Sequence, residues 1–102
     1  MNEEDENWSK ILNDFAREAS KKGLTDIVLQ VLRLGKISKE TIDFCVNAFI
    51  ERKDLSAAIS VTGQGEASIE TMIHLKDACI ADGQPWSAIY SSVIGQEIRN
   101  LQ

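Results

Sequence analysis

The sequence has little of what catalytic, metal-binding and disulfide-stabilised proteins need. Its 102 residues include one histidine, two cysteines and one proline, and aromatic residues make up only 6%. The two isolated cysteines, Cys45 and Cys79, lie in apolar segments, a usage that fits a reducing compartment better than a secreted disulfide scaffold. We therefore expect both cysteines to pack in a core and the protein to be cytoplasmic.

Long apolar runs and a basic leader are also missing. No stretch approaches the roughly 18 apolar residues of a membrane span, and the N-terminus is acidic where signal and transit peptides are basic. Residues 3–6 supply four of the sixteen acidic residues, so the net charge of −5 falls to −1 beyond them. A nearly neutral body argues against a broad nucleic-acid surface. We predict an acidic disordered leader over 1–6 and one helical domain over 7–102.

Apolar residues recur at helical spacing along most of the chain. The first such stripe runs from Trp8 to Ala19, and Gly23 follows it at the place of a left-handed helix end. The next segment, 24–34, is rich in Ile, Val and Leu and could also be a strand. We favour a helix there, because the chain offers no second strand-like segment to satisfy its backbone hydrogen bonds.

Four further helices are predicted from cap and turn residues. Ser38 and Asp54 are suitable N-caps for the third and fourth helices, and Ser68 or Gly65 for the fifth. Pro85 suits the first position of a sixth helix that runs almost to the C-terminus. These segments predict an all-α fold of six helices in three antiparallel hairpins, a short α-solenoid-like stack. The expected core is led by Leu12, Phe15, Leu32, Phe49, Leu75 and Ile89.

The hairpins repeat with a period of 30 to 31 residues. A shift of 30 places the second hairpin on the third, with Ala48 on Ala78, and a shift of 31 places Lys22 on Lys53. The stretch 42–58, with a polar turn at 52–54, is the most repeat-like. Over residues 8–99 the chain resembles, in architecture, the tetratricopeptide and pentatricopeptide helix-hairpin repeats, although its period is shorter. The resemblance implies stacked hairpins and assigns no functional residues.

Candidate catalytic and metal-binding groups are few. His74 and Asp77 are one turn apart on the fifth predicted helix, a spacing at which a surface contact is more common than acid–base catalysis. No serine or cysteine has an identifiable base, and no set of ligands has a recognised metal-binding spacing. We therefore expect no enzymatic activity, no cofactor, no metal and no small-molecule substrate.

Basic residues suggest one candidate surface. Lys21, Lys22, Arg52 and Lys53 follow the first helix of hairpins one and two, and stacking would align them as a basic edge. These cations also complement the negative ends of helices, which is the simpler interpretation. Nucleic acid is not the partner that we expect, but an RNA-binding repeat that uses this edge is the alternative function.

The predicted last helix suggests the preferred surface. It carries small residues beside a large apolar stripe, although the end of a stack needs a polar outer side. We predict a non-enzymatic protein-interaction or adaptor module that binds a protein partner, or a second copy of itself as a homodimer, through this helix. The predicted protein-binding residues are Trp86, Ile89, Tyr90, Val93, Ile94 and Ile98.

Overall fold

The computed structural model describes residues 3–35 and 37–83, and all of its regular structure there is α-helical. The elements are α1 (Glu3–Lys21), α2 (Thr25–Leu32), α3 (Lys39–Glu51), α4 (Leu55–Gln64) and α5 (Ile69–Ala81). The all-α prediction is confirmed. Segment 24–34 contains the helix α2, Thr25–Leu32, so the helix favoured there over a strand is confirmed.

The prediction of six helices in three hairpins is wrong for this structure. Five helices form two hairpins, α1–α2 and α3–α4, followed by the single helix α5. The helix expected after Pro85 lies outside the described residues. Helix α1 begins at Glu3, so residues 3–6, expected in a disordered leader, belong to the helix. Acidic residues suit the first turn of a helix because its unpaired N–H groups form the positive end of the dipole.

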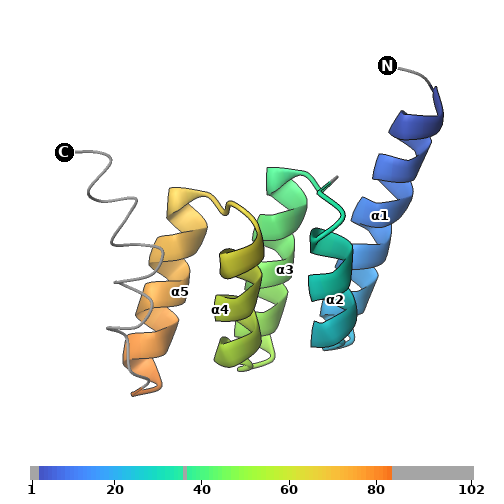
Figure 1. The fold of residues 1–102 in the computed structure, drawn as a ribbon. Coiled ribbons are helices and arrows are strands. Elements are labelled where there is room, and N and C mark those ends of the chain that lie inside the picture. The colour runs from blue at the N-terminus through green and yellow to red at the C-terminus, as the bar shows by residue number, and fades with distance from the viewer. Residues whose placement is uncertain (1–2, 36, 84–102) are drawn as a thin grey trace.

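The five helices are arranged in two layers (Figure 1). Helices α1, α3 and α5 stand in one row, where α3 contacts both of its neighbours. Helices α2 and α4 form the second layer and contact each other as well as the first row. Helix α1 lies at one end of the row, so one of its sides has no neighbouring helix among the described residues (Figure 1).

The turns set the period of the stack at 30 residues. Gly23, Lys53 and Gly83 follow α1, α3 and α5, and each has a left-handed backbone, with φ of 74°, 61° and 71°. The first two turns also contain equivalent hydrogen bonds: Leu24 N donates to Ala19 O, and Asp54 N donates to Phe49 O, each at 2.9 Å. This is the Schellman type of helix end. The 31-residue shift between the first two hairpins is therefore wrong by one residue.

Side-chain caps repeat with the same period. Ser38 caps α3 by accepting a hydrogen bond from Thr41 N, and Ser68 caps α5 by accepting one from Thr71 N. The preceding first-row helix reaches each cap: Asn13 Oδ1 accepts from Ser38 N at 2.9 Å, and the carboxylate of Asp43 accepts from Ser68 N at 2.8 Å. Each unit is thus hydrogen-bonded to the next at an equivalent point, the N-cap residue of the following first-row helix. The predicted caps Ser38 and Asp54 are confirmed, and α5 uses Ser68 rather than Gly65.

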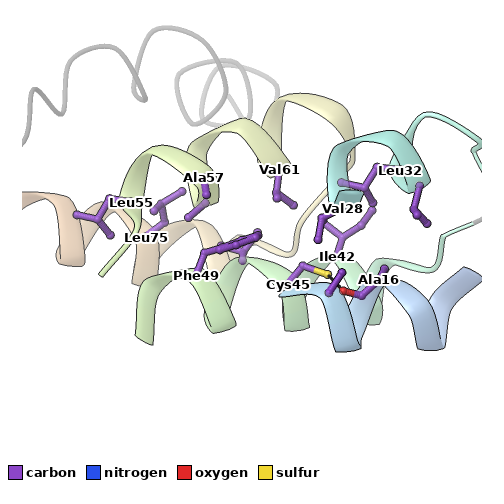
Figure 2. Close-up of a cluster of buried hydrophobic side chains, with 14 of the residues drawn as sticks. Ala16, Val28, Leu32, Ile42, Cys45, Phe49, Leu55, Ala57, Val61 and Leu75 are labelled. Atoms are coloured by element: carbon purple, nitrogen blue, oxygen red, sulfur yellow. Dashed lines mark hydrogen bonds between the residues drawn. The ribbon is translucent and has the colours of Figure 1, made fainter. Parts of the chain in front are cut away.

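The core lies between the two layers (Figure 2). Of the six predicted core residues, Leu32, Phe49 and Leu75 are buried, Leu12 is partly buried, and Ile89 lies outside the described residues. Phe15 is 52% exposed, so its placement in the core was wrong. Cys45 and Cys79 are both buried free thiols, as predicted.

Candidate interaction surfaces

The surface preferred from the sequence lies outside the described residues. Its six residues, from Trp86 to Ile98, belong to the predicted last helix, so its role in binding stays a prediction. Three surfaces of the described residues lie on α1 or beside it: the basic edge, the face of α1 and α3 around Phe44, and the side of α1 at the end of the row.

The structure places the basic edge at the turns that end α1 and α3. Arg52 donates from Nη1 to the carbonyl oxygen of Lys21 at 3.0 Å. Its guanidinium also lies over Gly23, where a Cβ atom would come within 2.6 Å of Arg52 Nε. Arg52 therefore joins the first two units by completing the α1–α2 turn. The structure favours this structural role, consistent with the simpler interpretation of the basic residues.

Two cations of α1 lie over the ring of Phe44 in α3. Arg17 Cζ is 5.9 Å and Lys21 Nζ is 5.6 Å from the centre of its ring, both within the range of cation–π attraction. A hollow of about 370 Å³ beside it is lined by Lys21, Phe44, Asn47, Ala48, Glu51 and Arg52. Since acidic and basic groups both line this hollow, its charge does not select an anionic ligand.

The side of α1 at the end of the row is an apolar surface that sequence reasoning missed. Trp8, Ile11 and Phe15 are 57%, 53% and 52% exposed. They are three and four residues apart, so they lie on one side of the helix. We call these three residues the open face of α1. A contiguous exposed set of large apolar side chains is typical of an interaction site.

The repeat shows what normally covers this position. Thirty residues on, the counterparts of Ile11 and Phe15 are Thr41 and Cys45 in α3, and both are fully buried. The covering element is α1 itself, because Cys45 Sγ donates to the carbonyl oxygen of Ala16. The next counterparts, Thr71 and Leu75 in α5, are also buried. The open face of α1 is thus the one copy of this position, among three described, that no helix covers.

A sequence signal for this face did exist. The argument that the end of a stack lacks a covering repeat applies to the first helix as much as to the last. From the sequence, that conclusion is drawn for the last helix alone, and Leu12 and Phe15 of the α1 stripe are expected in the core. The apolar stripe covers two sides of α1: Ala16 and Ala19 lie on a buried side, whereas Ile11 and Phe15 lie on an exposed side.

The remaining reactive groups have structural partners. His74 Nδ1 lies 2.7 Å from Asn47 Oδ1, and Asp77 pairs with Lys76 rather than with the histidine. Burial raises the pKa of the Cys45 thiol, opposed by a hydrogen bond with Ser20 and the charge of Arg17. Burial and the nearby charge of Asp82 raise the pKa of Cys79. Thiols of raised pKa are poor nucleophiles at neutral pH.

Searches of the described ranges for other kinds of site gave nothing. Among residues 3–35 and 37–83, no group of three or more His, Cys, Asp or Glu side chains is placed to hold a metal ion. None of the five helices is both long and apolar enough to cross a membrane.

Comparison of the chain with protein-family models, with curated proteins and with solved structures gives no match. The resemblance to tetratricopeptide and pentatricopeptide repeats therefore stays a prediction from the sequence.

Proposed function

We propose that this protein is a non-enzymatic interaction module that binds another α-helix along the open face of α1. The observation that carries the proposal is the difference in burial between equivalent positions. Ile11 and Phe15 are more than half exposed, whereas their counterparts in α3 and α5 are buried, and in α3 the counterpart Cys45 donates a hydrogen bond to Ala16 O of α1. The stack thus presents, at one end of the described row, a large apolar surface at a position that is buried in the other two first-row helices.

Several features suit this surface to a helix rather than to an extended peptide. The open face runs along a single helix, and within the row α3 packs against the helices α1 and α5. An extended strand would need exposed backbone groups to pair with, and the interior of an α-helix offers none. An amphipathic helix needs only an apolar stripe, which Trp8, Ile11 and Phe15 supply.

The test is a selection of binders from a library of amphipathic helical peptides, followed by affinity measurements on variants. We expect selected peptides to lose binding to Phe15→Asp, because a carboxylate would be placed in the centre of the contact. The matched control is Ile73→Asp, which alters a residue of similar exposure, 49%, on α5 at a distance from α1. Fluorescence anisotropy of a labelled peptide gives the affinity, and circular dichroism checks that each variant folds.

The same measurement can contradict the proposal. If no peptide is selected, or if the selected peptides bind Phe15→Asp as well as the unaltered chain, the open face is not a helix-binding site. Loss of binding in Ile73→Asp alone would assign the interaction to the other end of the row.

A further inference from the structure

The open face of α1 belongs to a longer seam with a defined spacing. Continuing from Trp8, Ile11 and Phe15 by steps of three and four residues reaches Glu18 and Lys22 in one direction and Glu4 in the other. Steps that alternate between three and four are the spacing at which two helices pack along each other as a coiled coil. Glu18 and Lys22 are exposed, and Lys22 continues the helical hydrogen bonding, with its N–H donating to Glu18 O.

The seam is complementary to itself when reversed. An antiparallel pairing centred at the height of residue 13 sets position 4 against position 22, position 8 against 18, and position 11 against 15. Ile11 then meets Phe15 of a second copy at the apolar centre, on both sides of a two-fold axis. At each end position 4 of one copy, a glutamate in the sequence, comes level with position 22 of the other copy, a lysine, so the register matches residues of opposite charge.

The middle pair of the seam is also compatible. Trp8 would lie opposite Glu18 of the second copy, and its indole N–H is a donor for which a carboxylate is a suitable acceptor. A parallel pairing would instead set Glu4 against Glu4, Glu18 against Glu18 and Lys22 against Lys22. Like charges in contact at three levels would oppose that arrangement.

From this self-complementarity we propose that the occupant of the open face is α1 of a second copy of this chain, packed antiparallel in a two-fold symmetric dimer. The inference rests on the proposed function and names its partner. An isologous contact of this kind closes on itself and does not propagate into a filament. Helix α1 has 19 residues and is about 28 Å long, at about 1.5 Å per residue. One helix pair makes a small interface, so the dimer should dissociate on dilution.

The first experiment measures the oligomeric state by sedimentation equilibrium from low to high micromolar concentration. We expect a reversible monomer–dimer equilibrium whose dissociation constant rises on the order of 100-fold in Ile11→Asp, the effect of a residue at the centre of an interface. The matched control, Ile73→Asp, should dimerise like the unaltered chain. A monomer at every concentration would overturn the proposal, and so would a dimer that survives Ile11→Asp.

Charge exchange tests the predicted register. Lys22→Glu and Glu4→Lys should each weaken the dimer about fivefold, since each sets like charges together at both ends. The double variant restores opposite charges and should recover most of the lost affinity. No recovery would contradict the pairing of positions 4 and 22. Loss of the dimer in Ile98→Asp but not in Ile11→Asp would overturn the proposal and assign self-association to the predicted last helix.

Disulfide trapping tests the direction of packing. Thiols introduced by Ile11→Cys in one copy and Phe15→Cys in the other should cross-link on mixing, because antiparallel packing brings these positions together. The chain's own Cys45 and Cys79 are buried and should not compete. Preferential cross-linking of two Ile11→Cys chains would indicate parallel packing and contradict the proposal. If all of these tests find a monomer while selected helical peptides still bind, the proposed function stands and only the second copy as partner is excluded.

Discussion

Helices α1 and α3 hold equivalent places in the row, yet they differ in the size and the burial of the side chains at equivalent positions. Helix α3 is covered on both sides, by α1 and α5, whereas in the described part of the chain α1 has a first-row neighbour on one side only. At the position where α3 has the small, buried Cys45, α1 has the large, exposed Phe15. A side chain that would not fit an internal position is thus found where there is no neighbour to limit its size.

The two hairpins also differ in which of their two helices carries the large core residues and which carries the small ones. Thirty residues separate Ala19 of α1 from Phe49 of α3, and the same step separates Ile27 and Val28 of α2 from Ala57 and Ala58 of α4. All six residues belong to the core or pack against it. Phe49 is fully buried and lies between α3 and α4 (Figure 2). Interiors are close-packed, so a large residue in one layer requires small ones in the other.

The largest expected effect comes from replacing the large core residue Phe49 of the second hairpin with alanine, the residue at the equivalent position of the first hairpin. Phe49→Ala removes a fully buried ring and should lower the free energy of unfolding by about 3–5 kcal/mol, which is a large part of the stability of a small domain. Urea denaturation followed by circular dichroism measures the loss. Adding Ala57→Ile and Ala58→Val gives the second hairpin the residues of the first and should restore part of the stability. A triple variant less stable than Phe49→Ala would show that the hairpins do not exchange volume in this way.

An intermediate effect is expected at the turn between α1 and α2. Gly23→Ala places a Cβ on a left-handed backbone and within 2.6 Å of Arg52 Nε, so Arg52 would have to move away from the Lys21 carbonyl. We expect a loss of about 1–2 kcal/mol of unfolding free energy. In the Arg52→Ala background the same change should cost less, because only the backbone strain remains. Equal losses in the two backgrounds would show that the contact of Arg52 with the turn contributes nothing.

Sequence reasoning located most helices because their ends carry local chemical signals. Ser38 and Asp54 have side-chain oxygens that cap a helix, and Gly23 readily adopts a left-handed backbone. These signals depend on a few neighbouring residues, so no tertiary information is required. The buried positions of Leu32 and Phe49 followed in the same way from helical spacing.

The errors arose where the outcome depends on neighbours that a local pattern does not include. The stripe of α1 predicts an apolar side but does not show that Phe15 faces the end of the row. The 31-residue shift followed the identity of Lys22 and Lys53, whereas the backbone aligns Gly23 with Lys53. A left-handed lysine is not expected from sequence, because the side chain disfavours that conformation. An uncovered end is expected at α1 as well as at the last helix, but which apolar residues of α1 lie on its open face follows only from the placement of the helices.

The smallest effect is expected at Lys53, and it concerns the difference between the turn after α3 and the glycine-containing turns after α1 and α5. Lys53 has φ of 61°, and glycine occupies the equivalent place in the other two turns. Lys53→Gly should relieve about 1–2 kcal/mol of backbone strain, offset in part by the greater freedom of glycine in the unfolded chain. The net gain should be about 0.5 kcal/mol, visible as a higher midpoint of urea denaturation. Lys53→Ala removes the same charge but keeps a Cβ atom on the left-handed backbone, so it should give no such gain. Equal stability of the glycine and alanine variants would mean that the left-handed lysine is not strained, and that the two turns differ only in the charge they carry.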